Sequence, residues 1–561
     1  MRTSGGFWGI AALLLLAMPA LAAPQAVTLG AGDPVADPVA ACGELAASPY
    51  ESGWAGRGHT DAQIYLDGAL TACEAAAQAS PDSAETATWL ARVYTLVGRA
   101  IEAAPLLDGA APAGNRLAAY LLSHLLSGSA GNDVESDDDR AKELLKQASD
   151  AGFAPAETEL AATYETGADI GPDYPGALKL YQLAAAQNEP TAIYKLGYFY
   201  QNGLGTDQDY AKAMQLFQQA ADAGEPLGWN GIGQLWQLGQ GVAQDNARAI
   251  EAYQHGADAG EKMAETALAY FYEQGLGVEK DYDKSFALLT DAAAQDYGFA
   301  QASLALHYLY GEGTAVDADH AYPLAWAAVN QQVNYAEGIL GYMLAEGLGT
   351  PRDLDEALEH FQTGAAGGDQ FSADRVSITE AEIACADQAG SQYESSTQPH
   401  GLDFVAIDAG AAISACEAAV AANSTSVGDK VWLGRAYARA ERYDEALPLL
   451  QQGIEAGSGL AQVTYGDLQM SGIGMAQDQA AAVKLYRAAG DAEFPLAQYA
   501  LGVIYANGMG VVADPATALD WFRKADANGM NDAQQQIDLL TAAPSTTEPD
   551  LTGFGREELT Y

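Results

Sequence analysis

The segment from Thr191 to Pro226 reads TAIYKLGYFYQNGLGTDQDYAKAMQLFQQAADAGEP, and it decides the fold. Its first part places Leu196, Phe199 and Tyr200 at i, i+3 and i+4, which is the spacing of one buried helix face. A glycine-rich turn follows, and then a second apolar-periodic stretch that closes on Ala-Ala. The segment therefore predicts two helices joined by a short turn.

The same unit recurs with a fixed period of 36 residues. Its turn glycine is found at Gly167, Gly203, Gly239, Gly275, Gly311 and Gly347, and again at Gly472 and Gly508. Six residues after each glycine stands an aspartate: Asp173, Asp209, Asp245, Asp281, Asp317, Asp353, Asp478 and Asp514. A period of roughly 20–50 residues is typical of stacked repeat proteins. We therefore expect an all-α fold, an α-solenoid of stacked helix-turn-helix units.

The turn residues indicate how each helix ends and begins. Gly203 and Gly205 are expected to end the first helix, because glycine tolerates the positive φ of a C-terminal cap. The aspartate is expected to cap the second helix, because its carboxylate accepts hydrogen bonds from the free N–H groups of the first turn. We predict this capping role for Asp209, Asp245, Asp281, Asp353, Asp478 and Asp514. Small residues on the first helix, such as Gly197 and Ala269, are expected to let a neighbouring helix approach closely.

Length and charge limit the classes of function. At 561 residues the chain is too long for a single core. It carries 75 Asp and Glu against 26 Lys and Arg, a formal net charge of −49. Nucleic acid and anionic lipid surfaces are therefore disfavoured as partners, because both are bound through clustered Lys and Arg. The acidity is explained either by solubility or by selection for a basic partner or for cations.

The first 22 residues read as a secretory signal peptide. Arg2 supplies the positive charge, Ile10 to Met18 is a short apolar run, and Ala20-Leu21-Ala22 has the form of a cleavage site. No later apolar run is long enough to cross a membrane, so no membrane span is predicted. We expect the mature protein to be periplasmic or secreted.

Four cysteines reveal a duplicated module. They are Cys42, Cys73, Cys385 and Cys416; each pair is 31 residues apart, and a shift of 343 relates the pairs. The same shift carries Tyr50-Glu51-Ser52 to Tyr393-Glu394-Ser395, and Trp89-Leu90 to Trp432-Leu433.

Four cysteines allow three pairings. The duplication favours structural disulfides Cys42–Cys73 and Cys385–Cys416, and export makes oxidation reasonable. A metal site or catalytic thiols is the alternative, but His59 in one copy corresponds to Leu402 in the other.

The repeated pattern Leu-Gly-x-x-Tyr-x-x-Gly-x-Gly-Val-x-x-Asp, followed by Ala and by Ala-Ala-x-x-Gly, resembles the Sel1-like repeat, a relative of the tetratricopeptide repeat. The segment from Leu501 to Val511 matches it closely. Eight copies are clear, and a degenerate copy spans Asn115 to Gly152. The copy at Gly167 has Ala168-Asp169 where Leu-Gly is usual, so its turn is expected to be longer or looser. The cysteine modules resemble tetratricopeptide-type helix pairs, and segments found beside such repeats in alpha-proteobacterial proteins.

The chain is accordingly divided into a signal peptide (1–22), a first cysteine module (42–114), seven repeats (115–368), a joining segment (369–384), a second cysteine module (385–457), two repeats (458–529) and a disordered tail (541–561). Each cysteine module is expected to cap a repeat array, because the end units of a stack must hide their outer face. Residues 530–540 are predicted to form a closing helix.

The sequence contains little that indicates chemistry. It has no His-Glu-x-x-His pair, no nucleophile elbow and no phosphate loop, so no catalytic residue, metal ligand or cofactor is predicted. His307 stands where other repeats have an apolar core residue, and is predicted to line the core. His320 lies near Asp317 and Asp319 and offers a metal site, but Asp317 is already explained as a helix cap.

A candidate binding surface follows from the repeat register. Five residues before successive turn glycines stand Tyr198, Gln234, Tyr270, Leu306 and Tyr342, off the buried face of the first helix. First helices are expected to line the concave side of the stack, where rigid, amphipathic tyrosines suit peptide binding. We therefore predict partner-binding roles for Tyr198, Gln234, Tyr270 and Tyr342. Ordinary packing between repeats is the alternative.

The resulting hypothesis is a non-enzymatic secreted scaffold or adaptor that binds a protein or peptide on its concave face. The resemblance implies adaptor roles, including those of periplasmic regulators of sensor kinases or of exopolysaccharide machinery. The alternatives are an envelope hydrolase that uses the groove and an acidic cation-binding protein. Carboxylates and histidines with shifted pKa values grouped in one cleft would favour the enzyme. The oligomeric state is left open.

Overall fold

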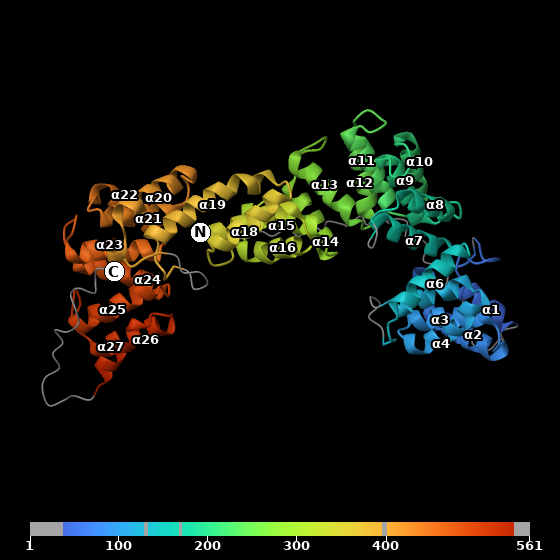
Figure 1. Cartoon of the computed structure of the whole chain (residues 1–561), viewed down its shortest axis with the longest axis horizontal. Helices are drawn as coiled ribbons and strands as arrows, with labels where there is room; N and C mark the ends of the chain where they lie inside the picture. Colours follow the sequence, from blue (N-terminus) through green and yellow to red (C-terminus); the bar gives the residue numbers. More distant parts are fainter. Residues whose placement is uncertain (1–36, 56, 128–132, 168–170, 395–400, 543–561) are drawn as a thin grey trace, which may run out of the picture. The chain divides into compact units, whose positions relative to one another are not determined.

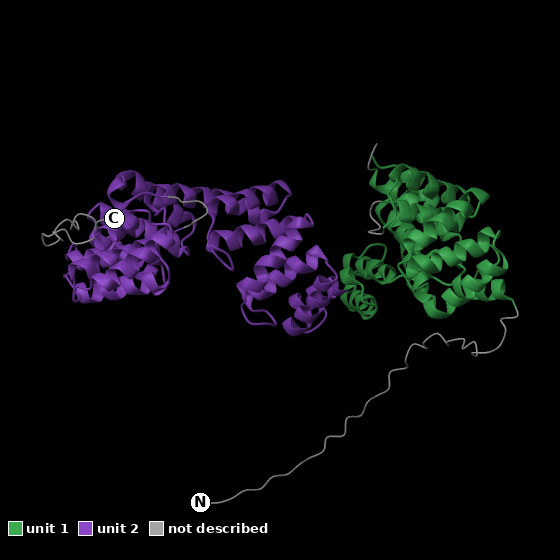
Figure 2. Ribbon diagram, turned by 90° about the horizontal axis from the view of Figure 1, so that it is seen from below, with its two compact units in different colours: residues 1–264 green, residues 265–561 purple. Residues whose placement is uncertain are grey.

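The computed structural model describes residues 37–55, 57–127, 133–167, 171–394 and 401–542. Within these ranges every regular element is helical, which confirms the predicted all-α class (Figure 1). The chain divides into two compact units, residues 1–264 and 265–561 (Figure 2). The predicted signal peptide, the tail from 543 onward and the atypical turn at 168–170 lie outside the described residues.

The first unit begins with the first cysteine module, followed by helix pairs of the repeat array. The module contains α1 (Pro38–Ala46), α2 (Leu66–Ala79), α3 (Ala84–Leu96) and α4 (Ala100–Ala110), with short 3-10 turns at Asp61–Gln63 and Ala111–Ala113. The array continues with α5 (Arg116–Leu126), α6 (Asp138–Asp150), α7 (Ala154–Thr166), α8 (Tyr174–Ala185), α9 (Pro190–Asn202), α10 (Tyr210–Asp222), α11 (Leu227–Leu238) and α12 (Asn246–Asp258). Helix α13 (Lys262–Gln274) spans the boundary between the units.

The second unit contains the remaining repeats and the second cysteine module. Its helices are α14 (Tyr282–Ala294), α15 (Gly298–Tyr310), α16 (Ala318–Asn330), α17 (Asn334–Glu346), α18 (Leu354–Ala366), α19 (Gln370–Ala389), α20 (Ala409–Ala422), α21 (Val427–Arg439), α22 (Tyr443–Glu455), α23 (Gly459–Ser471), α24 (Gln479–Asp491), α25 (Pro495–Asn507), α26 (Pro515–Ala527) and α27 (Asp532–Thr541), with a 3-10 turn at Phe404–Ala406. The closing helix predicted at 530–540 corresponds to α27. Residues 370–384 of the expected joining segment lie in the continuous helix α19, which also carries Cys385.

Within each unit a helix packs mainly on the helices before and after it in the chain, as expected for a stack of two-helix repeats. The glycine turn explains how each pair closes. Gly203 ends α9 with a left-handed φ of 67° and donates its N–H to the carbonyl of Phe199. The N–H of Asp209 then bonds to the carbonyl of Tyr200 at 2.8 Å, while its carboxylate accepts the N–H of Lys212 at 2.9 Å. One turn therefore ends the first helix and caps the second.

This capping geometry is repeated along the chain. Side-chain oxygens of the six aspartates accept a backbone N–H in the first turn of α10, α12, α14, α18, α24 and α26: Asp209, Asp245, Asp281, Asp353, Asp478 and Asp514. At Asp281 the pKa is lowered, first by the backbone bond from Lys284. At Asp514 the hydroxyl bond from Thr517 comes first, and that pKa is also lowered. The carboxylates of Asp281 and Asp514 are thus held in their charged form at the positive ends of helices.

Close packing of the two helices depends on small residues in the first. A Cβ on Gly197 would lie 2.8 Å from the ring of Phe217, which is completely buried on α10. The same relation joins Gly502 of α25 to Phe522 of α26. The small residues four positions before these rings, Ala213 and Ala518, are also fully buried, and the predicted close approach is therefore present in the structure.

Both predicted disulfides are present, which confirms the pairing. Cys42–Cys73 joins α1 to α2, with Cα atoms 4.6 Å apart, and Cys385–Cys416 joins α19 to α20, with Cα atoms 4.5 Å apart. Each closes a loop of about 32 residues, which on the chain-entropy model contributes about 3–4 kcal/mol to stability.

Candidate functional site

The binding surface predicted from the repeat register consists of the residues five positions before each turn glycine, which we call the ladder positions. These residues are exposed in some repeats only. In the first unit, Tyr198 of α9 is exposed and Gln234 of α11 is half-buried. In the second unit, Tyr270 of α13 is exposed, whereas Leu306 of α15 and Tyr342 of α17 are half-buried. The position is therefore a surface position in both units, but neighbouring side chains cover it to different extents.

The second unit adds further rings to this surface. Phe299 and Tyr310 on α15, and Phe371 on α19, are 49%, 61% and 49% exposed, beside Tyr270 at 47%. Along a first helix these positions are seven or four residues from the ladder position, and such spacings return to the same face of a helix.

Neighbouring rings contact one another along this surface. The centroids of Phe299 and Tyr335 are 6.2 Å apart, and those of Tyr342 and Phe371 are 6.3 Å apart. We call this surface the aromatic face; it consists of Tyr270, Phe299, Leu306, Tyr310, Tyr335, Tyr342 and Phe371. Counting only the ladder position missed four of these residues, although spacings of seven and four from that position would have found them.

The exposed rings are distributed unequally between first and second helices. In residues 265–371, all of which the structure describes, every exposed Phe, Tyr or Trp lies on α13, α15 or α19. On the second helices of this stretch, α14, α16 and α18, every Phe, Tyr and Trp is buried or half-buried. The surface is therefore specific to one side of the repeats.

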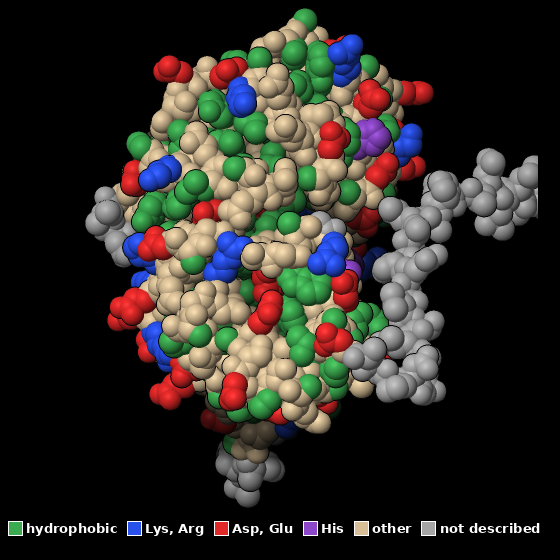
Figure 3. Space-filling model, turned by 90° about the vertical axis from the view of Figure 1, so that its right-hand side faces the viewer, with side chains coloured by type: hydrophobic (Ala, Val, Ile, Leu, Met, Phe, Trp, Pro, Cys, Tyr) green, Lys and Arg blue, Asp and Glu red, His purple; other side chains and the backbone are tan. Residues whose placement is uncertain are grey.

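In the view of Figure 3, the charged side chains do not gather into a patch of one sign. There the Lys and Arg side chains lie singly among Asp and Glu side chains. This face offers no basic patch for a phosphate backbone, in agreement with the net charge.

His307 lies in the core of its repeat, as predicted, and is 2% exposed. Its Nε2 is 2.8 Å from Oε1 of Glu273 and 3.3 Å from Oγ of Ser285, and its Nδ1 is 2.6 Å from the carbonyl of Glu312. Burial lowers the pKa of His307, but the bonds to Glu273 and to the Glu312 carbonyl outweigh it, so the pKa is raised overall. Serine, histidine and carboxylate are thus together, but Ser285 is completely buried, and no substrate carbonyl reaches its hydroxyl.

His320 is a partner of a helix cap. Its Nδ1 lies 2.7 Å from Oδ2 of Asp317, whose other oxygen accepts the N–H of His320 at the start of α16. Across the described ranges, no group of three or more His, Cys, Asp or Glu side chains is arranged to hold a metal ion. No helix in the described part of the chain is long and apolar enough to cross a bilayer.

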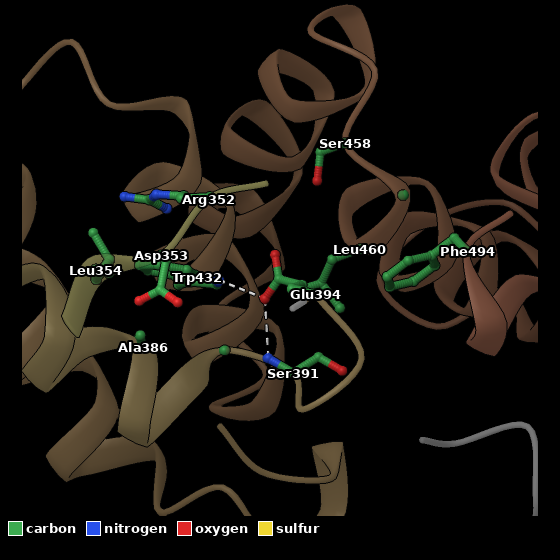
Figure 4. Close-up of a pocket in the computed structure, with 12 residues that line it drawn as sticks. Arg352, Asp353, Leu354, Ala386, Ser391, Glu394, Trp432, Ser458, Leu460 and Phe494 are labelled. Atoms are coloured by element: carbon green, nitrogen blue, oxygen red, sulfur yellow. Dashed lines mark hydrogen bonds between the residues drawn. The ribbon is translucent and has the colours of Figure 1, made fainter. Parts of the chain in front are cut away.

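A pocket of about 260 Å³ lies within the second unit, between the start of α18, the end of α19, α21 and the start of α23 (Figure 4). It is lined by Arg352, Asp353, Leu354, Ala386, Gly390, Ser391, Glu394, Trp432, Ser458, Gly459, Leu460 and Phe494. The sequence did not indicate this pocket, since its residues come from distant parts of the chain.

Glu394 is the carboxylate held most specifically in the pocket. Its Oε2 accepts the indole N–H of Trp432 at 2.8 Å and the N–H of Ser391 at 3.0 Å. Although the residue as a whole is exposed, desolvation raises the pKa of its carboxyl, and these two bonds and Arg435 oppose the rise only in part. The carboxylate is thus placed where a cation would stabilise it.

Behind the pocket lies a buried charged cluster. The guanidinium of Arg352 is 4.7 Å from the ring centroid of Trp432, and its Nε donates to the carbonyl of Ala345 at 2.7 Å. Its Nη2 lies 3.8 Å from Asp429 and 3.9 Å from Glu382, both of which are buried. Burial, with the charge of Glu382, raises the pKa of Asp429 to about 7.

The pocket is better suited to binding than to acid–base catalysis. No histidine is among the described residues that line it, and the hydroxyl of Ser458 caps α23 by accepting the N–H of Ala461 at 3.2 Å. The carboxylate of Asp353 caps α18. A nucleophile beside a general base is therefore not formed by these side chains.

The Sel1 repeat family matches nine segments that together make up more than half of the chain: residues 116–153, 154–189, 190–225, 230–261, 262–297, 298–322, 335–369, 459–494 and 495–529. The chain belongs to the Sel1 repeat family. Sel1 repeats are generally protein-interaction scaffolds, and the fold is typically non-catalytic. The first matched segment corresponds to the degenerate copy recognised in the sequence.

Solved Sel1-type structures are similar to the chain. One is a protective antigen present in uropathogenic Escherichia coli strains that displays an SLR fold; it is 26% identical, with 81% of this chain and 93% of that chain covered and a TM-score of 0.40. Another is a Sel1 repeat protein from Oxalobacter formigenes, 28% identical, with 41% of this chain and 94% of that chain covered and a TM-score of 0.37. No curated protein matches the chain.

Proposed function

We propose that the chain is a non-enzymatic scaffold of the bacterial envelope or exterior that binds a protein or peptide partner through the aromatic face, on the concave side of its repeats. Membership of the Sel1 family supports the scaffold role. The two disulfides are consistent with an oxidising compartment outside the cytoplasm. The resemblance to periplasmic regulators supports a role in envelope regulation, such as control of exopolysaccharide.

The observation that carries the proposal is the one-sided exposure of the Phe and Tyr rings. Tyr270, Phe299, Tyr310 and Phe371 are each about half or more exposed, and no second helix between 265 and 371 has an exposed Phe, Tyr or Trp. Contiguous exposed apolar surface marks interaction sites, because leaving it in water costs free energy that a partner recovers. Aromatic side chains also bury a large area with only two rotatable bonds to order.

The acidity of the chain favours a basic partner. A net charge of −49 attracts positively charged proteins over distances longer than the contact itself, and so raises the rate of association. Binding is then expected to slow as salt is added, because screening acts first on these long-range forces.

A triple variant tests the proposal. We expect Tyr270→Ser, Tyr310→Ser and Phe371→Ser together to abolish capture of a partner from an envelope extract of the source organism. The matched control is Val316→Ser, which removes a side chain that is 67% exposed but lies in the turn between α15 and α16. Equal capture by wild type, control and triple variant would show that the aromatic face is not the binding surface.

The hydrolase alternative is less well supported. Ser285 beside His307 is inaccessible, and no histidine is among the described residues that line the pocket around Glu394. The cation-binding alternative stays a prediction, and calorimetric titration with calcium tests it.

A further inference from the structure

The duplication of the cysteine module provides an internal comparison for the pocket. The shift of 343 residues carries Glu51 to Glu394 and Trp89 to Trp432. In the first module the Trp89 indole donates to Glu51 at 3.2 Å, and the N–H of the serine three residues earlier donates at 2.6 Å. The second module has the same two kinds of bond. Both copies therefore hold a carboxylate in the same way.

The copies differ at the first residue of the helix that follows the module. This residue is Arg116 in α5 and Gly459 in α23. The Arg116 guanidinium donates to the carbonyl of Tyr50, the neighbour of Glu51, and to the carbonyl of Gly152 at 2.8 Å. An arginine of the chain itself thus covers this end of the first module. Glycine has no side chain to do so in the second, and there the structure has a pocket.

The pocket offers both a charge and an apolar wall. Figure 4 shows the Glu394 carboxylate between Trp432, Leu460 and Phe494, with the oxygen that takes no drawn bond directed into the space below Ser458. Among the described residues, no donor bonds to Oε1 of Glu394; both hydrogen bonds go to Oε2. A guanidinium forms charge-assisted bonds to a carboxylate, and its aliphatic stem packs on apolar side chains.

Among the described residues, no Lys or Arg donates a hydrogen bond to Glu394, although the charges of Arg435 and Arg352 oppose the rise in its pKa. Arg352 is the only Lys or Arg among the described residues that line the pocket, and its guanidinium is engaged by the carbonyl of Ala345 and by Asp429 and Glu382. The open oxygen of Glu394 is therefore available to a cation from outside.

We propose that the pocket formed by Glu394, Trp432, Leu460 and Phe494 binds an arginine side chain of the partner protein, at the place that Arg116 covers in the first module. The inference rests on the proposed scaffold function and names one residue type that the partner presents. The excess of acidic over basic residues in the chain favours such a cationic partner.

The test uses the full-length chain labelled with 5-fluorotryptophan and the probe N-acetyl-arginine methylamide. Fluorine NMR follows the Trp432 resonance, assigned with Trp432→Phe. We expect a saturable shift with the arginine probe and none with the citrulline counterpart, which has nearly the same shape but no charge. Glu394→Gln is expected to weaken binding by at least about 10-fold, because a charge-assisted bond is lost. Glu51→Gln is the matched control and is expected to bind as wild type does.

Two results would overturn the inference: equal shifts with the arginine and citrulline probes, or unchanged affinity of Glu394→Gln. The comparison of probes needs no variant, so it stays decisive even if Glu394→Gln alters the fold. The proposed function is read separately, from partner capture by the aromatic-face triple variant. If the probe fails while capture still depends on the aromatic face, only the arginine pocket is refuted.

Discussion

Replacing Asp429 by Asn is predicted to stabilise the protein at neutral and alkaline pH. Asp429 lies on α21 with no exposed surface, and neither of its carboxylate oxygens accepts a hydrogen bond from a described residue. The nearest cation, Arg352, is 3.8 Å away and is shared with Glu382. Asparagine removes the buried charge and leaves Arg352 paired with Glu382.

The magnitude follows from the pKa of Asp429, which burial raises from 3.8 to about 7. In the unfolded chain this carboxyl ionises near pH 4, whereas in the folded chain it holds its proton until about pH 7. Between these values the folded state binds the extra proton, so stability falls as pH rises, and the penalty is complete above about pH 7. Three pKa units correspond to about 4 kcal/mol, of which roughly 3 kcal/mol is relieved between about pH 8 and pH 5.

Urea unfolding followed by circular dichroism at about pH 8 and pH 5 measures this difference. Wild type is expected to gain stability on acidification relative to Asp429→Asn, which is expected to be the more stable at pH 8. Asp444→Asn, an exposed change on α22, serves as the control. The reasoning is refuted if Asp429→Asn is less stable than wild type at pH 8, or if both proteins respond equally to pH.

Three further predictions concern packing, protonation and cross-linking. Gly502→Val is expected to lower the free energy of unfolding by about 1–3 kcal/mol, because its Cβ would lie 2.5 Å from a buried ring. Gly109→Ala is the control and is not expected to destabilise, because a Cβ there has nothing within 4 Å. Thermal melts that rank the two variants otherwise would contradict the packing. The pKa of His307 is raised in the folded state, so its ion pair with Glu273 stabilises the fold fully below the unfolded pKa, near 6.5. This stabilisation is lost as the pH rises through the folded pKa. Between about pH 6 and 9, the melting temperature of wild type is therefore expected to fall through this loss, and that of His307→Phe is not. Cys42→Ser with Cys73→Ser is expected to cost about 3–4 kcal/mol in urea unfolding, and unchanged stability would contradict a structural role for this disulfide.

The helices of the repeats could be predicted from the sequence because the signals are local. A glycine that takes positive φ, as Gly203 does, and an aspartate six residues later determine where one helix ends and the next begins. The segment 369–384 lacks this turn. It also lacks glycine and proline, so nothing stops α19 before Cys385.

The candidate site was less predictable, because it depends on contacts between distant residues. The register located Tyr342, but not the guanidinium of Arg375, whose centre lies 5.9 Å from its ring centroid. Aligning the two cysteine modules shows that Gly459 stands in the second copy at the position of Arg116 in the first. That it accompanies a pocket beside Glu394 depends on how α18, α19, α21 and α23 pack, which no local pattern specifies.

Site-specific photocrosslinking tests most directly whether the aromatic face is the binding surface. A photoreactive phenylalanine would replace Tyr270 or Tyr310 on the first helices, and, in a separate protein, Thr290, which is exposed on the second helix α14. In an envelope extract of the source organism, positions 270 and 310 are predicted to crosslink to the same protein, and position 290 to none. Crosslinking of that protein from position 290 alone, or from all three positions equally, would contradict the proposed binding surface.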